Sequence, residues 1–270
     1  MPFAENQGVR IHYEVEGNGP PVVLMHGFSS DFRSWYEYGY VKGLSGDYEL
    51  ILIDARGHGA SDKPHTPEAY EMNRMVADVV SVLDDHGVSK AGYMGYSMGG
   101  RIGFRIPLYA PNRFNSLILG GAVYPLQGDE DAKDEILAQL YLALEAAREE
   151  SPDNPMAAYL ARLEKARGQT VSPTTRAVFL SNDAVALQAA NLAARRSVNP
   201  SAEDAMPRFT MPCLIFVGEA DPRYLVAKEC ARRIAKSSFV SFPGLDHTLT
   251  FARSDLVLPH VRRFLVSNTS

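Results

Sequence analysis

The stretch AGYMGYSMGGRIGFRI, residues 91–106, decides the fold. It begins as a short apolar strand would and continues from Met98 with the apolar spacing of a helix. Between the two lies GYSMG at 95–99, a G-x-S-x-G pattern. So tight a turn from strand to helix needs small residues two positions before and after the serine. It lifts the Ser97 hydroxyl above the sheet, at the positive end of a helix. An ordinary glycine-rich turn is the alternative, but the position at a strand end favours a nucleophile.

Short apolar runs alternate with helical patterns over most of the chain. VRIHYEVEG at 9–17 alternates instead, which predicts a half-exposed antiparallel strand near the sheet edge. Residues 68–86 repeat apolar side chains at helical spacing before Gly87. Together these patterns predict an α/β fold with a doubly wound, mostly parallel sheet. The runs typical of strands covered on both faces are 21–27, 49–55, 91–97, 114–123 and 212–219.

Residues 125–205 interrupt this rhythm, because they contain helical segments and no strand-like run. Ser172 is followed by proline, which is typical of an N-cap and the first helical position. Asp183 is expected to cap a last helix in this segment. We therefore predict an α/β core of residues 1–124 and 206–270 with a helical insertion at 125–205.

Composition limits the kinds of partner. The chain is 46% hydrophobic and 22% charged, which is close to the globular average and unlike disordered chains. It has no apolar run of about 18 residues and no basic-then-apolar N-terminal pattern, so neither a transmembrane helix nor a signal peptide is expected. With 27 Lys and Arg against 32 Asp and Glu, it lacks the basic excess that nucleic-acid binding requires. We expect a cytoplasmic protein with no membrane or nucleic-acid partner.

The two cysteines do not form a metal or disulfide pattern. Cys213 lies in an apolar run and Cys230 in a helix-like stretch, and the sequence has no CxxC or Cys/His cluster. We predict two buried thiols in a reducing compartment and no metal site.

A serine nucleophile needs a histidine base, which in this architecture follows the serine in the chain. Only His247 and His260 do so. His260 falls in an amphipathic C-terminal stretch, where a place on a helix surface is expected. His247 lies in a loop between the strand-like run 237–242 and the last helix, so it can reach over the carboxyl edge of the sheet. The predicted base is His247.

The base in turn needs a carboxylate to orient it. Asp221 follows a buried apolar run directly and precedes His247 by enough residues for one helix and one strand. Glu219 abuts the same run and is expected to point elsewhere. Asp246 is adjacent to His247 in sequence, and neighbouring side chains usually diverge. The predicted acid is Asp221.

Acyl transfer also requires hydrogen-bond donors for the developing oxyanion. One is expected from the backbone N–H of Met98, directly after the nucleophile. The other is expected from the backbone N–H of Phe28, because Gly27 lets the chain turn toward the site. His26 precedes the serine in the chain, and bracing this loop is its expected role.

Taken together, these motifs resemble those of the α/β-hydrolase-fold serine hydrolases, in the same order and over nearly the whole chain. The resemblance implies that residues 125–205 form a cap over the active site. The matching segments are HGF (26–28), DARGHGASDKP (54–64), GYSMGG (95–100), GEADP (218–222) and LDHTLT (245–250).

The resemblance also implies that the loop containing Asp54, Arg56 and His58, after the fourth strand, is structural and not catalytic. The sequence departs from the family pattern at Pro107, in the helix that follows the serine. This proline is expected to kink or end that helix without disturbing the turn at Ser97.

Members of the family that cleave epoxides or carbon–halogen bonds use aspartate as nucleophile, so Ser97 argues against those reactions. Carbon–carbon hydrolases typically carry HGxGPG, which the loop HGFSSDFRSW at 26–35 lacks. This loop resembles those of small esterases, enol-lactonases and cofactor-free haloperoxidases, or perhydrolases. Ligand receptors of this fold commonly lose a triad residue, and this chain keeps all three. A non-hydrolytic lyase stays open, since it would retain the same residues.

We therefore predict a carboxylic ester hydrolase that cleaves a small, largely uncharged ester or lactone through an acyl-enzyme on Ser97. No metal or organic cofactor is implied, because His247 and the oxyanion donors supply the activation. The acyl chain is expected to lie under the cap. Trp35, Tyr141 and Tyr159 are candidates to line that pocket, and packing within the protein is the alternative for each.

Overall fold

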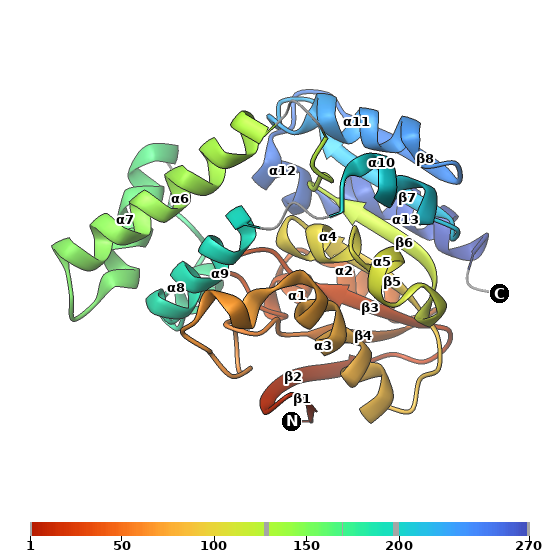
Figure 1. The fold of residues 1–270 in the computed structure, drawn as a ribbon, viewed down its shortest axis with the longest axis horizontal. Coiled ribbons are helices and arrows are strands. Elements are labelled where there is room, and N and C mark those ends of the chain that lie inside the picture. Colours follow the sequence, from red (N-terminus) through yellow and green to blue (C-terminus); the bar gives the residue numbers. More distant parts are fainter. Residues whose placement is uncertain (1, 127–129, 169, 197–199, 269–270) are drawn as a thin grey trace.

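The computed structural model describes residues 2–126, 130–168, 170–196 and 200–268, and within them eight strands form one sheet (Figure 1). The order across the sheet is β1-β2-β4-β3-β5-β6-β7-β8. Strand β2 is antiparallel to β1 and β4, and all other neighbours are parallel. The strands are β1 (Phe3–Asn6), β2 (Val9–Glu16), β3 (Pro21–Met25), β4 (Glu49–Ile53), β5 (Ala91–Tyr96), β6 (Phe114–Gly120), β7 (Cys213–Gly218) and β8 (Ser237–Phe242).

Helices cover both faces of this sheet, which confirms the predicted α/β architecture. One face packs against α3, α4, α5 and α11, and the other against α1, α2 and α13. The helices before β6 are α1 (Arg33–Glu37), α2 (Tyr40–Leu44), η1 (Pro67–Tyr70), α3 (Met72–Asp85), α4 (Met98–Gly103), α5 (Ile106–Tyr109) and η2 (Pro111–Arg113). Those after β7 are α11 (Tyr224–Arg233), α12 (His247–Ala252) and α13 (Ser254–Val266).

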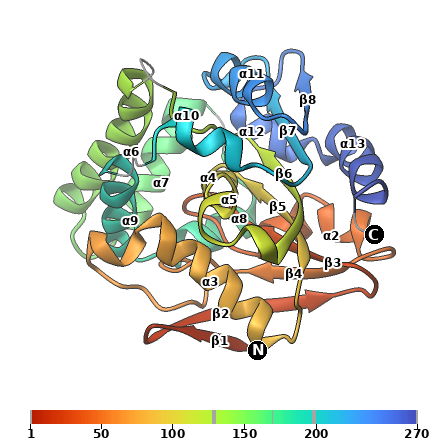
Figure 2. The same cartoon turned by 45° about the vertical axis from the view of Figure 1, so that its right-hand side comes forward.

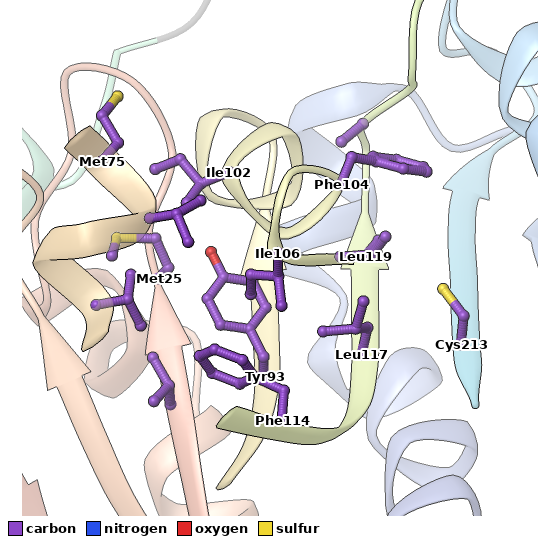
Figure 3. Close-up of a cluster of buried hydrophobic side chains, with 14 of the residues drawn as sticks. Met25, Met75, Tyr93, Ile102, Phe104, Ile106, Phe114, Leu117, Leu119 and Cys213 are labelled. Atoms are coloured by element: carbon purple, nitrogen blue, oxygen red, sulfur yellow. The ribbon is translucent and has the colours of Figure 1, made fainter. Parts of the chain in front are cut away.

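The hydrophobic core encloses β5, in the interior of the sheet. Every residue of β5 and β7 is buried, as expected for strands covered on both faces. Alternate side chains of β5 enter opposite layers: Tyr93 lies in one core cluster and Met94 in the other. Figure 3 shows Tyr93 between Ile106 and Phe114, beside Leu117 of β6. This packing fixes the end of β5, where Ser97 follows.

The N-terminal edge differs from the sequence prediction in one respect. Strand β2 is antiparallel and near the edge as predicted, but β1 lies outside it. Strand β1 was not predicted, because its four residues, FAEN, are too few to show a pattern.

A second difference from the sequence prediction concerns the expected helix over 68–86. It is interrupted at Glu71, whose extended ψ of 141° separates η1 from α3.

An all-helical insertion lies between β6 and β7. Figures 1 and 2 both show α6 to α9 grouped at one end of the sheet. Residues 127–129, 169 and 197–199 of the predicted segment lie outside the described residues. The helices are α6 (Glu130–Glu150), α7 (Pro155–Arg167), α8 (Pro173–Leu180), α9 (Ala184–Arg196), α10 (Ala202–Ala205) and η3 (Met206–Arg208).

Both predicted helix caps of the insertion are present. The Ser172 hydroxyl accepts the N–H of Thr175 at 3.0 Å, at the start of α8. One oxygen of Asp183 accepts the N–H groups of Val185 and Ala186, at 2.9 and 3.0 Å, at the start of α9. These bonds satisfy N–H groups that the first helical turn leaves unpaired.

Two further predictions are confirmed. Helix α4 ends at Gly103, and Pro107 lies in the first turn of the separate short helix α5. Cys213 and Cys230 are not in a disulfide, and both are fully buried. Among the described residues, no helix combines the length and apolar character needed to cross a membrane.

Candidate active site

Ser97 occupies a strained turn between β5 and α4. Its φ of 55° and ψ of −110° are unfavourable for a residue with a side chain. The surrounding glycines allow the turn to close: a Cβ on Gly95 would lie 2.4 Å from the Gly99 carbonyl, and one on Gly99 only 2.1 Å from the Met25 oxygen. The Ser97 N–H donates to the Gly120 carbonyl at 2.8 Å. The glycines of the G-x-S-x-G pattern are therefore required by close packing, as predicted.

The structure brings together the three residues that the sequence analysis selected. His247 begins α12, and its Nε2 lies 3.0 Å from Ser97 Oγ. Its Nδ1 lies 2.7 Å from Asp221 Oδ2. The Asp221 side chain is fully buried, whereas 29% of the His247 side chain is exposed. This chain of contacts can pass the hydroxyl proton of Ser97 to the imidazole while Asp221 holds the ring in place.

The groups around Asp221 favour the ionised form of its carboxyl. Burial by itself would raise the pKa of this carboxyl, but the hydrogen bond from His247 and electrostatic attraction to His247 and Arg223 outweigh it. The pKa of Asp221 is therefore lowered. Arg223 donates to Asp221 Oδ1 from its backbone N–H at 3.0 Å and from its guanidinium at 3.1 Å. An ionised Asp221 can stabilise the imidazolium that forms when His247 accepts a proton.

Two residues at the site were missed by the sequence analysis. Arg223 contacts Asp221 and also lies 3.4 Å from His247 Nδ1. Tyr96 is buried beside the imidazole at a ring distance of 5.2 Å, and its hydroxyl donates a hydrogen bond to the His247 carbonyl. Burial raises the pKa of Tyr96 well above its usual range, so the phenol keeps this proton. The only available signal was that each residue is close in sequence to Ser97 or Asp221.

The loop after β3 lies directly against Ser97. A Cβ on Gly27 would be 3.4 Å from Ser97 Cβ, so the Gly27–Phe28 peptide borders the nucleophile. His26 braces this loop, as expected: its Nδ1 lies 2.7 Å from the Gly27 carbonyl, and its Nε2 accepts the Ala55 N–H at 3.1 Å. Met98 is the first residue of α4, where a helix leaves N–H groups unpaired. This arrangement is compatible with the predicted donors Phe28 and Met98.

The polar side chains of residues 54–59 contact other buried parts of the protein. Asp54 is fully buried and lies 2.8 Å from the Nδ1 of His12. The guanidinium of Arg56 pairs with the buried carboxylate of Asp78. Burial, with a smaller effect of His26, lowers the pKa of His58 to about 3, so its imidazole is neutral. These contacts agree with the structural role implied by the family resemblance.

Two of the three predicted pocket residues are packed inside the protein. Trp35 is fully buried in the core, where it meets the stacked rings of Tyr40 and Phe251 edge-on at 5.1 Å each. Tyr159 is buried in the cluster that joins α6, α7 and α9. Both therefore follow the packing alternative, because neither exposes a face to a ligand. Tyr141 is half-buried, with the Arg195 guanidinium 5.8 Å from its ring centre, and its place in a pocket stays a prediction.

The helix that follows the nucleophile, α4, carries a cationic side chain. Arg101 follows Ser97 by one helical turn and is half-buried; its guanidinium donates to the Ala194 carbonyl of α9 at 3.1 Å. Burial, together with nearby Arg105 and Arg223, lowers the pKa of Arg101 to about 10. Unlike Arg56, it has no acidic partner among the described residues.

No group of three or more His, Cys, Asp or Glu side chains within the described residues could hold a metal ion.

Comparison with known proteins identifies the family. Residues 20–222 match the family model described as the alpha/beta hydrolase fold, so the chain belongs to this family. It is 26% identical over 274 residues to a protein of Bacillus subtilis (strain 168) that is provisionally named 2-succinyl-6-hydroxy-2,4-cyclohexadiene-1-carboxylate synthase. That alignment covers 97% of each chain.

The names of other relatives describe different activities. A protein of Synechocystis sp. provisionally named non-heme chloroperoxidase is 28% identical over 272 residues, 95% of each chain. The crystal structure of the enol-lactonase from Burkholderia xenovorans LB400 superimposes with a TM-score of 0.77 at 23% identity, covering 98% of this chain and 100% of that one. The last similarity shows the fold alone.

Proposed function

We propose that this protein is a serine hydrolase that cleaves a small carboxylic ester or lactone through an acyl-enzyme on Ser97. The observation that carries the proposal is the chain of contacts from Ser97 Oγ to His247 at 3.0 Å and from His247 to Asp221 at 2.7 Å. It begins at a serine held at positive φ at the end of a central strand. This combination is typical of an activated nucleophile.

In the first half of the reaction, Ser97 Oγ attacks the ester carbonyl carbon while its proton passes to His247 Nε2. The carbonyl oxygen becomes negative and accepts hydrogen bonds from the N–H groups of Phe28 and Met98. The carbon–oxygen bond to the leaving group then breaks, and the leaving oxygen takes the proton from His247. Asp221 keeps the imidazole oriented and stabilises its positive charge.

In the second half, His247 removes a proton from water, and the resulting hydroxide attacks the acyl carbon. The bond to Ser97 Oγ breaks, and the serine recovers its proton from His247. The products are a carboxylic acid and an alcohol, or a hydroxy acid when the substrate is a lactone.

A second candidate is a non-hydrolytic lyase that acts on a carboxylate-bearing substrate, with His247 as the base. Arg101 favours it, because a substrate carboxylate would neutralise this cation, which has no acidic partner among the described residues. The name of the Bacillus subtilis relative also describes a carboxylate product. In this reaction Ser97 would orient the substrate without becoming acylated.

A panel of p-nitrophenyl esters of graded chain length, assayed beside lactones, tests the main proposal. We expect turnover of at least one neutral substrate, and turnover lower by about 10⁴-fold or more in Ser97→Ala. A carboxylic acid with a leaving group on the β-carbon, from which a base can eliminate that group, tests the second candidate. Its turnover should leave Ser97 unacylated and should be slower in the variant Arg101→Met. If no ester or lactone were hydrolysed although a fluorophosphonate labelled Ser97, the hydrolase proposal would be wrong.

A further inference from the structure

The loop that borders Ser97 contains a second strained residue. Ser29 has a φ of 57°, and it is the third residue of a turn that the Ser30 N–H closes by donating to the Gly27 carbonyl at 3.3 Å. Turns with positive φ at this position normally place glycine or asparagine there. The Ser29 hydroxyl donates to the Phe28 carbonyl at 2.7 Å, which supports the turn from within. Because the conformation is unfavourable for serine, contacts from outside must also hold it.

One such contact comes from the helical insertion. The side-chain amide of Asn182, in the connection between α8 and α9, donates to the Ser29 carbonyl at 3.0 Å and to the Val178 carbonyl at 3.0 Å. Asn182 is 9% exposed, and the contact with Ser29 is buried. Two bonds from one planar amide fix its orientation, so the carboxyl end of α8 is tied to the turn beside the nucleophile.

A second contact joins the same turn to the insertion. The Phe28 side chain packs against the cluster of α6, α7 and α9 and against the cluster of α9 and η1. On its other side the ring meets His58 edge-on at 5.7 Å. The residue whose N–H is the proposed oxyanion donor therefore has its side chain held between the core and the insertion.

We propose that Asn182 is a positioning residue for the oxyanion hole: through Ser29 it holds the 27–30 turn so that the Phe28 N–H faces the reacting oxygen. The inference rests on the proposed acyl transfer at Ser97. Oxyanion donors act because they are aligned before the reaction, and a displacement of about 1 Å can cost about 10²-fold in rate. The insertion thus contributes to the rate of the chemical step as well as to the shape of the site.

The test compares two variants of Asn182 with a matched control from the same connection. Asn182→Leu removes the donor at similar volume, and Asn182→Asp keeps the shape but removes the N–H groups. The control is Ser181→Ala, because the Ser181 hydroxyl donates to the same Val178 carbonyl at 2.9 Å and does not reach Ser29. Circular dichroism and Tm show that each variant is folded.

We expect both Asn182 variants to lower kcat on the best ester by about 10-fold to 10²-fold, with KM changed by less than about threefold. The affinity for a trifluoromethyl ketone, which forms the tetrahedral adduct, should fall in parallel. Ser181→Ala should keep the wild-type values. A loss confined to KM, or a loss of kcat without a change in ketone affinity, would overturn the inference.

The rate of Ser97 labelling by a fluorophosphonate separates this inference from the proposed function, since labelling does not need the natural substrate. Slower labelling of the Asn182 variants than of wild type and Ser181→Ala supports the inference. If wild type is labelled and the Asn182 variants react equally fast, the inference fails while the nucleophile stands. If wild-type Ser97 is not labelled at all, the proposed function itself fails.

Discussion

Two histidine–aspartate pairs of nearly the same length have different surroundings. His247 Nδ1 lies 2.7 Å from Asp221, and His12 Nδ1 lies 2.8 Å from Asp54. Both carboxylates are fully buried. The histidines differ, because 29% of the His247 side chain is exposed but only 1% of the His12 side chain. His247 and Asp221 are therefore the exposed pair, and His12 and Asp54 are the buried pair.

The groups around the two pairs explain their different roles. The other ring nitrogen of His247 faces the Ser97 hydroxyl at 3.0 Å, whereas that of His12 faces the Glu14 carboxylate at 3.3 Å. Asp54 also accepts the N–H groups of Phe32 and Ala60, both at 2.9 Å. A histidine–aspartate pair is therefore not a site by itself; it needs a nucleophile beside the free nitrogen and access for a substrate.

The largest expected effect is at the nucleophile. Ser97→Ala removes the attacking oxygen from the exposed pair, so ester turnover should fall by about 10⁴-fold or more. Mass spectrometry of the fluorophosphonate-treated protein should find the label on Ser97 and on no other serine. Full activity in the variant, or labelling elsewhere, would contradict the assignment.

Removing the charge of the exposed pair should be almost as damaging. Asp221→Asn cannot accept the Nδ1 proton in the same way, so His247 loses its required tautomer and kcat should fall by about 10⁴-fold. Asp246→Asn is the matched control, because Asp246 caps α12 by accepting the Leu249 N–H at 2.7 Å. We expect it to keep most activity. A greater loss from Asp246→Asn would show that Asp246, and not Asp221, is the carboxylate that orients His247.

The same change in the buried pair should affect stability instead. Asp54→Asn leaves His12 without its charged partner, and breaking a buried ion pair typically costs about 3–5 kcal/mol of unfolding free energy. Urea unfolding gives the loss of stability, and active-site titration gives kcat per folded molecule, which should stay near wild type. A large fall in kcat with unchanged stability would show that Asp54 takes part in the reaction.

The buried pair also predicts a pH dependence of stability. Burial would lower the pKa of His12, but Asp54 and Glu14 outweigh it, so the pKa is raised in the folded state. A raised pKa stabilises the fold fully below about 6.5, the usual unfolded value, and this contribution is lost as pH rises through the folded pKa. The stability difference between wild type and His12→Gln should therefore shrink from pH 5.5 to pH 9. A difference that is independent of pH would contradict the charged pair.

The smallest expected effect is in the insertion, outside both pairs. Tyr141→Ala should change KM or the preferred acyl length by a few-fold, because it removes packing surface and no proton-transfer group. The pH midpoint of kcat/KM should stay where it is in wild type. A shift of that midpoint as large as the one caused by Asp221→Asn would place the insertion in the proton-transfer machinery.

The exposed pair could be predicted from the sequence, and the buried pair could not. Asp221 and His247 each follow a strand-like run, and parallel strands bring their carboxyl ends to one edge. His12 lies in an alternating strand whose second face reads as solvent-exposed. On that face the His12 ring is covered by Phe3 of the short strand β1, by Phe32 and by Asp54 from the loop after β4, and none of these segments has a strong local pattern.

Side-chain direction limited the prediction of the site as well. Arg223 and Tyr96 reach the triad because of their rotamers and the path of the chain, which spacing alone does not specify. Trp35 carries the same aromatic signal whether it lines a pocket or packs in a core, and burial decided for the core. The sequence thus predicts which strand ends meet, whereas side-chain partners follow from three-dimensional packing.

The contact between Ser97 and His247 has a consequence for how the protein acquires its reactivity during folding. These residues are 150 positions apart in the chain. Closing so long a loop is entropically unfavourable, and long-range contacts of this kind form slowly. The central strands can therefore pair before the histidine loop arrives over the serine. During refolding, far-UV circular dichroism should recover before Ser97 becomes reactive, so an early compact chain would be structured but chemically inert.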